Sequence, residues 1–381
     1  MTTEKKDIKR DMDKSYLKEI VIQDFRNIEQ SHLTFSEGTN VIYGDNGNGK
    51  TNLLEAVWLM TGGKSFRGSK DRELIKFSSE FFRIEGVVHG TQYDGDEKLT
   101  LVCHSKDSRF ASRMAKIGGG ENYVSPTEII GNFYRVIFSP AHLEIVGGGP
   151  AVRRRFMDAC LCQLYPAFIA SYRRYNRVLA QRNAFLKNRR DYSAADVENF
   201  LGIYDTELAT YRVQIYRFRN EFINYLSLFG GKYYENISGG KESITFEYNP
   251  SVTDFEGIVQ KLAAVRERDI AMGFTTHGPH REDINIKING VSARDFASQG
   301  QRRSAVIAMK LAEREIMQQV TGIAPAILLD DVLSELDYSR QDYLLNNITG
   351  RQSFITSCHL ERINMSAARK FYVEGGIVQE G

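Results

Sequence analysis

The sequence predicts an α/β protein with a mainly helical lobe inserted into it. Three features support this fold class. A glycine-rich loop, residues 44–51, stands between a short apolar strand and a predicted helix. A second strand, residues 326–329, is fully apolar, as in the middle of a parallel sheet. Between them, residues 151–229 have a helical pattern and almost no glycine.

Length, composition and charge restrict which classes of protein this chain can belong to. The 381 residues suffice for two or three domain-sized units, and 42% hydrophobic content can form a core. The net charge of +2 means that any nucleic-acid site is a local patch. The four cysteines form no CxxC pair, which predicts free thiols in a reducing cytosol. We expect a cytoplasmic protein without a membrane partner, since no apolar stretch has membrane-spanning length.

The glycine-rich loop has the pattern G-x-x-x-x-G-K-T. Its residues are Gly44, Asp45, Asn46, Gly47, Asn48, Gly49, Lys50 and Thr51. Glycines let backbone N–H groups turn inward toward phosphates, and the following helix start adds partial positive charge. Lys50 would bind the β- and γ-phosphates of ATP, and the Thr51 hydroxyl would bind Mg²⁺. A chance glycine-rich turn is the competing interpretation, which the flanking strand and helix disfavour.

Two carboxylates end the second apolar strand. Asp330 would hold Mg²⁺, and Asp331 would orient and polarise the water that attacks ATP. Two solvated acids at a strand end are the alternative. The upstream phosphate loop favours the catalytic interpretation, so the predicted catalytic residues are Lys50, Asp330 and Asp331.

Basic residues gather in the helical block. Residues 151–220 contain thirteen Arg and Lys side chains and six Asp and Glu side chains, so the rest of the chain is net acidic. Such a cluster, which includes Arg177, Arg182 and Lys187, can bind DNA phosphates without sequence preference, although basic helices are often only solvated faces. The candidate DNA contacts are Arg153, Arg154, Arg155, Arg173, Arg174, Arg189 and Arg190.

The remaining pattern predicts the element order. Strands are expected at 16–25, 31–35, 39–43, 82–88, 99–104, 135–140, 243–248, 284–288 and 353–357, and helices at 51–60, 254–273 and 304–320. The short strand at 135–140 is expected in the centre of a sheet, and hairpins are expected for 16–25 with 31–35, for 82–88 with 99–104, and at 284–288 with the turn that follows it. Gly230-Gly231 is expected to end the helical block. The predicted division is a charged tail at 1–15, an ATPase lobe at 16–148 and 276–381, and a helical lobe at 149–275.

Several spaced motifs resemble the RecF family, whose members are similar to SMC heads without the long coiled coil. They are Asp24–Asn27, Gly278–Asp283, Ser298–Gln301 with the following arginines, and Asp330–Asp337. The resemblance runs from Tyr16 to the C-terminus. Two features depart from it: Gln301 precedes two arginines where the family commonly has a second glutamine, and the charged tail is extra.

The resemblance implies an ABC/SMC-type P-loop ATPase head in which two subunits sandwich two ATP molecules. Ser298, Gly300 and Gln301 would then form the signature loop and contact the γ-phosphate across the interface. Asp337 would couple the two sites, and His359 stands at the place of the switch histidine. Arg26 and Asn27 would flank the nucleotide. No glutamine near residues 138–143 provides the family's Q-loop.

The resemblance also implies an activity. It is that of a weak, DNA-dependent ATPase of recombinational gap repair, DNA replication restart and SOS induction. ATP and Mg²⁺ would close a homodimer on single-stranded, gapped or junction DNA, which then recruits mediators of the RecO and RecR type. The alternatives are the ATPase subunit of a transporter, an SMC-like scaffold and a small-molecule kinase. The scaffold would need long heptad segments, for which the interval between the two halves is too short.

Overall fold

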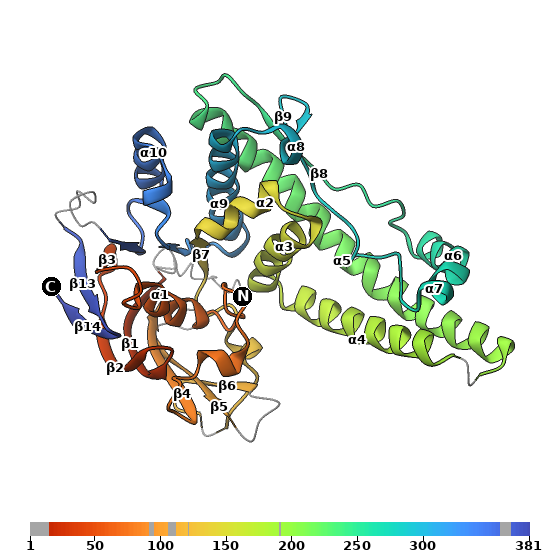
Figure 1. Ribbon diagram of the computed structural model, residues 1–381, viewed down its shortest axis with the longest axis horizontal. Helices are drawn as coiled ribbons and strands as arrows, with labels where there is room; N and C mark the ends of the chain where they lie inside the picture. Colours follow the sequence, from red (N-terminus) through yellow and green to blue (C-terminus); the bar gives the residue numbers. More distant parts are fainter. Residues whose placement is uncertain (1–14, 91–94, 106–111, 121, 190–191, 359–366) are drawn as a thin grey trace, which may run out of the picture. The chain divides into compact units, whose positions relative to one another are not determined.

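The computed structural model describes residues 15–90, 95–105, 112–120, 122–189, 192–358 and 367–381 (Figure 1). The chain forms two compact units, residues 1–142 with 313–381, and residues 143–312. The first contains both halves of the predicted nucleotide site, and the second contains the basic helices and residues 297–303. The predicted lobe at 149–275 is narrower than this second unit, and that domain division stays a prediction.

A six-stranded sheet organises the first unit. Its strands are β3 (Thr39–Tyr43), β7 (Arg135–Phe138), β11 (Ala326–Leu329), β12 (Ser353–Ser357), β13 (Arg369–Glu374) and β14 (Ile377–Glu380). They lie in the order β14-β13-β3-β12-β11-β7, and all neighbours are parallel except β13 and β14. The carboxyl ends of β3, β12 and β11 therefore meet at one edge of the sheet. Strand β7, expected in the centre of a sheet, lies at its border, and β13 and β14 were not predicted.

A five-stranded antiparallel sheet completes the first unit. Its strands are β1 (Tyr16–Phe25), β2 (Ile28–Thr34), β4 (Phe81–His89), β5 (Asp96–His104) and β6 (Ser112–Ile117), in the order β2-β1-β4-β5-β6. Strand β1 buries Leu17, Ile20 and Ile22 on one side, because its register against β4 shifts between Leu17 and Glu19. The three side chains join one core with Leu53 and Leu54 of helix α1 (Lys50–Leu59). The predicted hairpins are confirmed, whereas β6 was not predicted. The smaller elements are η1 (Asp71–Leu74), η2 (Pro126–Ile129), η3 (Pro140–Leu143), η5 (Val332–Glu335) and α10 (Tyr338–Ile348).

The three longest helices that lie wholly within the second unit are α3 (Pro150–Leu164), α4 (Pro166–Asn188) and α5 (Ala194–Ile237). Proline at the first position begins α3 and α4, and Ser193 caps α5 by accepting a hydrogen bond from the Asp196 N–H. Helix α5 has 44 residues, a length of about 66 Å, and α4 runs beside it (Figure 1). The expected end at Gly230 is wrong. A Cβ there would lie 3.0 Å from the Phe246 ring, so glycine provides close packing inside the helix.

Shorter elements complete the second unit. They are α2 (Glu144–Gly147), β8 (Ile244–Glu247), α6 (Phe255–Ala264), α7 (Arg266–Met272), β9 (Asn285–Ile288), β10 (Val291–Ser292), α8 (Ala293–Phe296) and α9 (Gln299–Thr321). The single helix expected at 254–273 is two helices, because the backbone departs from helical geometry at Val265. Helix α9 begins at Gln299, five residues before its expected start, and the boundary between the units falls within it. In the described part of the chain, no helix has the length and apolarity needed to span a membrane.

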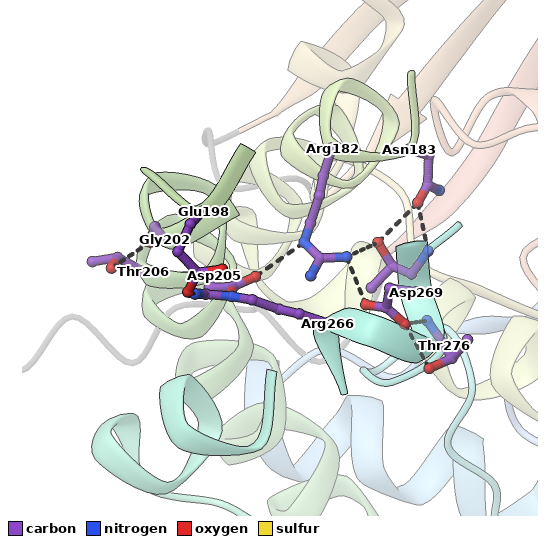
Figure 2. Close-up of polar contacts among 10 residues, drawn as sticks. Arg182, Asn183, Glu198, Gly202, Asp205, Thr206, Arg266, Asp269 and Thr276 are labelled. Atoms are coloured by element: carbon purple, nitrogen blue, oxygen red, sulfur yellow. Dashed lines mark hydrogen bonds and ion pairs between the residues drawn. The ribbon is translucent and has the colours of Figure 1, made fainter. Parts of the chain in front are cut away.

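Buried ion pairs hold α4 to α5 and α7 (Figure 2). The fully buried Arg182 donates to Asp205 Oδ1 at 3.0 Å and to Asp269 Oδ2 at 2.7 Å. Its Nη1 also donates to Thr275 Oγ1 at 2.9 Å, and Arg266 donates to the second oxygen of Asp205 at 2.8 Å. Burial raises the pKa of the Asp205 carboxyl to about 6, against the opposing attraction of Arg182. Arg182 is therefore a structural cation and does not belong to a DNA-binding surface.

Removing the charge at the centre of this network should destabilise the second unit. We expect Arg182→Ala to lower the free energy of unfolding by about 3–5 kcal/mol, since two buried carboxylates lose the guanidinium that they share, and Asp205 keeps only Arg266. The loss should shrink as the pH falls toward about 5, because a protonated Asp205 needs no cation. Urea unfolding at several pH values measures this. Arg268→Ala, an exposed arginine of α7, is the matched control, and equal effects of the two changes would contradict the account.

Candidate nucleotide site

The phosphate loop follows β3 and is shaped by two glycines. Gly44 has φ +146°, and a Cβ there would lie 2.2 Å from the carbonyl oxygen of Val373. Gly49 has φ +112°, and its Cβ would meet the Asn27 amide at 2.7 Å. Lys50 is buried, and its Nζ donates to the carbonyl oxygens of Gly44 at 2.8 Å and Asp45 at 3.0 Å. The loop thus curls around the lysine that was predicted to bind phosphates.

The two halves of the predicted site meet at Thr51 and Asp330. Thr51 Oγ1 donates to Asp330 Oδ1 at 2.8 Å, across 279 residues of sequence. Thr356 of β12, the strand between β3 and β11, donates to the same oxygen at 3.3 Å. Burial raises the pKa of Asp330, while the hydrogen bond from Thr51 opposes that shift. A nearby cation would therefore favour the ionised carboxylate.

The pair fits Mg²⁺, which prefers oxygen ligands and usually retains several waters. Thr51 supplies a hydroxyl and Asp330 a carboxylate. Among the described residues, no group of three or more His, Cys, Asp or Glu side chains could hold a metal by itself. The remaining ligands of a magnesium ion here would be phosphate and water oxygens, as in other nucleotide sites.

Asp331 leaves the line of the strand. Its φ of +51° is uncommon for a residue other than glycine, and its N–H donates to Thr356 Oγ1 at 2.8 Å. This bend directs the chain into η5, where Ser334 Oγ donates to the Asp331 carbonyl at 2.7 Å. Asp337 caps α10 by accepting from the Arg340 N–H at 3.1 Å. The catalytic role of Asp331 and the coupling role of Asp337 stay predictions.

Asn27 supports the phosphate loop directly. Its Nδ2 donates to the Asn48 carbonyl at 3.0 Å, and its Oδ1 accepts from Asn52 Nδ2 at 2.8 Å. The Gly376 N–H, in the turn between β13 and β14, donates to the same Asn48 carbonyl at 3.0 Å. The hydrogen bond from Gly376 was not predicted, because neither β13 nor β14 was recognised in the sequence. Arg26 instead binds the fully buried Glu55, with Nε 2.9 Å from Oε2.

A basic pocket of about 700 Å³ adjoins the loop. Its lining includes Asn27 and Asn52, which contact the loop region, and Phe77, whose ring is fully exposed. The cations in the lining are Arg26, Arg67, Arg72 and Lys76. The pocket therefore offers an aromatic ring and positive charge beside the phosphate loop. Phe77 was not predicted from the sequence, because a lone phenylalanine in a loop carries no motif.

Cys358 lies at the end of β12 and contacts the loop. Lys50 Nζ is 3.3 Å from its Sγ, and the thiol donates to Asn46 Oδ1 at 2.9 Å. Only the parallel pairing of β12 with β3 brings this cysteine there, so no local sequence signal indicates it. The predicted switch residue His359 and the predicted DNA contact Arg190 lie outside the described residues.

The signature residues stand at the start of α9 in the second unit. Gln301 N–H donates to Ser298 Oγ at 3.2 Å, and Ser298 N–H donates to Gln301 Oε1 at 2.8 Å. This reciprocal pair is a capping box, which fixes the first turn of the helix. Gly300 stands between Ser298 and Gln301 in the sequence. Contact of these three residues with a γ-phosphate across an interface stays a prediction.

The structure corrects one predicted DNA contact. Arg153 is 3% exposed, and its guanidinium binds both carboxylate oxygens of Asp283 and the Gly148 carbonyl. Three consecutive helical residues point about 100° apart, so a triple arginine cannot face solvent throughout. Arg154 is half-buried, with Nη1 donating to the Glu282 carbonyl at 2.7 Å, and Arg189 is half-buried as well. The exposed candidates are Arg155, Arg173 and Arg174.

Comparison with known proteins identifies the family. Residues 16–375 match the family model described as the RecF/RecN/SMC N terminal domain. The DNA replication and repair protein RecF of Caldanaerobacter subterraneus is 38% identical over 370 residues, which cover 95% of this chain and 99% of the relative. The chain belongs to the RecF family of DNA replication and repair proteins. A second RecF, from Lachnoclostridium phytofermentans, is 39% identical over 368 residues, covering 96% of this chain and 99% of that protein.

Solved structures agree with this RecF assignment. A structure of the recombination mediator protein RecF with ATP, in the RecFOR pathway, has a TM-score of 0.89 and 36% identity, covering 97% of this chain and 98% of that one. An Smc head domain from Pyrococcus furiosus has a TM-score of 0.55 at 14% identity, covers 96% of both chains and shows the fold alone. The predicted ABC/SMC-type head and the resemblance to RecF are confirmed.

Proposed function

We propose that this protein is an ATP-dependent DNA-binding protein of recombinational gap repair in which ATP acts as a switch. The observation that supports it most is the Thr51–Asp330 hydrogen bond beside the buried Lys50, in a chain of the RecF family. A solved RecF relative is described with ATP, which supports ATP as the nucleotide here. The pathway named for that relative supports mediators of the RecO and RecR type as partners. DNA replication restart, SOS induction and work in the cytoplasm belong to the same proposal.

The residues divide the chemistry among them. Thr51 and Asp330 would hold Mg²⁺, which screens the charge of the phosphates and of the developing transition state. Lys50 binds the terminal phosphates, and the N–H groups of the loop surround them. Asp331 orients the attacking water. Hydrolysis is weak and DNA-dependent in this proposal, since the switch needs ATP to persist until DNA is engaged.

The basic pocket beside the loop takes the base and ribose of ATP. Phe77 is exposed at its rim and offers a ring for stacking, and the flanking cations favour a polyanionic ligand. Asn27 and Asn52 line both the pocket and the loop region, so one ligand can reach both.

Two subunits close on two ATP molecules in this proposal. Ser298, Gly300 and Gln301 of one subunit meet the γ-phosphate bound by the other, with Asp337 linking the two sites. The exposed start of α9 is consistent with this role, because free N–H groups at a helix start favour an anion. ATP thus shifts the population from single chains toward the closed dimer.

DNA lies along the outward face of α4. This helix contains no Asp or Glu. Arg173, Arg177 and Lys187 are exposed and fall within about 80° of each other around the axis, opposite the buried Arg182. They extend over roughly 21 Å, which suits contact with several phosphates of single-stranded, gapped or junction DNA. Asp158, Asp205 and Asp269, by contrast, are buried and pair with Arg182 or Arg219 inside the unit.

A substitution of Lys50 tests whether ATP drives dimerisation and DNA retention. Lys50→Arg should abolish ATP-dependent dimerisation and DNA retention, because a planar guanidinium does not fit the buried space of the ammonium. Gel filtration and a DNA-retention assay with ATP measure both. An unchanged response of the variant would contradict the proposed switch.

The base pocket gives a second expectation. Phe77→Ala should weaken ATP binding at least about fivefold, because stacking of a base on an aromatic ring is lost. Binding of inorganic triphosphate, which has no base, should stay the same and serves as the internal control. Competition with a fluorescent ATP analogue measures both ligands. Equal weakening of the two would assign Phe77 to the loop and not to a base site.

The α4 surface gives a third expectation. Arg173→Ala combined with Arg177→Ala should reduce the slope of log K against log salt by about 2 on duplex DNA, or one unit per lost phosphate contact. Fluorescence anisotropy at several salt concentrations measures the slope. Arg268→Ala, an exposed arginine of α7, is the control. A slope that stays at the wild-type value would place the DNA elsewhere.

A further inference from the structure

One carboxylate joins the signature loop to the long helix α5. Glu242 Oε1 accepts from Gln301 Nε2 at 2.6 Å, and its Oε2 accepts from the Tyr234 hydroxyl at 2.8 Å. Tyr234 is fully buried in the last turns of α5. The three side chains form a continuous path from α5 to the start of α9, all within the second unit.

The backbone around Glu242 is fixed on both sides. Its N–H donates to Ser238 Oγ at 3.2 Å, and Ser238 is the residue that ends α5. The next residue, Ser243, donates its N–H to Asn289 Oδ1 at 2.9 Å in the turn after β9. A movement of the C-terminal end of α5 would therefore also move the Glu242 side chain.

Glu242 also determines which way the Gln301 amide points. A glutamine amide has one donor end and one acceptor end, and an ionised carboxylate only accepts hydrogen bonds. With Nε2 bound to Glu242, Oε1 must face Ser298 and accept its N–H. The reverse orientation would oppose two oxygens at one end and two N–H donors at the other. The capping box of the signature loop thus has its geometry set by Glu242.

We propose that Glu242 is a positioning residue for the signature loop, through which α5 controls the ATP-dependent closing of the dimer. This inference rests on the proposed function, in which the signature loop of one subunit meets ATP bound by the other. With Glu242 in place, the Ser298–Gln301 cap holds the start of α9 in one conformation. Without it, Nε2 loses its acceptor, only the Ser298 N–H holds the amide, and the loop loses part of the geometry that a phosphate requires.

The test compares Glu242→Ala with Glu242→Gln. The alanine variant should raise the protein concentration needed for ATP-dependent dimerisation at least about tenfold, as a charge-assisted hydrogen bond is lost. The glutamine variant should restore most of the wild-type value, because its Oε1 can accept from Gln301 and its Nε2 can donate to the Tyr234 oxygen. Analytical ultracentrifugation with ATP measures both.

Two controls separate positioning from general damage. ATP affinity of the single chain should stay at the wild-type value in Glu242→Ala, since the phosphate loop belongs to the other compact unit. Glu247→Ala removes another half-buried acid of the same segment, which binds Lys287 at 2.8 Å, and should leave dimerisation unchanged. Tyr234→Phe removes one donor to Glu242 and should have an intermediate effect, which tests the path if the alanine variant fails to fold.

A double-mutant cycle with Gln301→Ala tests whether the pair acts as a unit. Once Gln301 is absent, Glu242→Ala should cause no further loss of dimerisation. Additive losses would overturn the inference, as would wild-type or tighter dimerisation of Glu242→Ala. Failure of the wild-type chain to dimerise with ATP would instead overturn the proposed function, so the two failures are distinguishable.

Discussion

The hydrogen bond between Thr51 and Asp330 depends on the topology of one sheet. The two residues are 279 positions apart, and they meet because β3 and β11 flank β12 in parallel and end at the same edge. Of the chain between them, β7 belongs to this sheet, and the other segments leave the sheet and return to it. The second unit is therefore inserted in the chain between β7 and β11 of this sheet. The nucleotide site forms at the carboxyl-end edge of this sheet, to which β11 contributes a strand of only four residues.

Many charged side chains of the second unit are buried in ion pairs. Arg153, Arg182, Arg212 and Arg219 are all buried, and each binds one or more carboxylates of the same unit. Such pairs contribute little net stability but are costly to break, so they specify one arrangement of α3, α4 and α5. The two long helices α4 and α5 are thus joined by a buried ion pair, and other cations, such as Arg177 and Lys187, are exposed on α4. A count of basic residues in the sequence cannot distinguish the buried, paired arginines from the exposed cations.

Much of the fold was predictable because its signals are local. The phosphate loop, the apolar strand before Asp330 and the alternation in β1 each depend on a few adjacent residues. Gly230 misled the prediction, since its reason is the ring of Phe246, which only tertiary packing brings near. Arg153 misled it in the same way, since its partner Asp283 is 130 residues away. Cys358, Phe77 and Glu242 gave no signal at all, because each acts through a neighbour that is distant in sequence or through exposure alone.

The most direct measurement is the mass of the protein in solution, together with DNA binding, in the presence of ATP, ADP or no nucleotide. Light scattering with and without a gapped duplex gives both quantities for the unmodified chain. The account predicts a DNA-bound dimer with ATP only, and binding that weakens steeply with salt. If neither the mass nor the DNA affinity changes with the nucleotide, the proposed ATP switch is contradicted. The phosphate loop would then serve a purpose other than a switch.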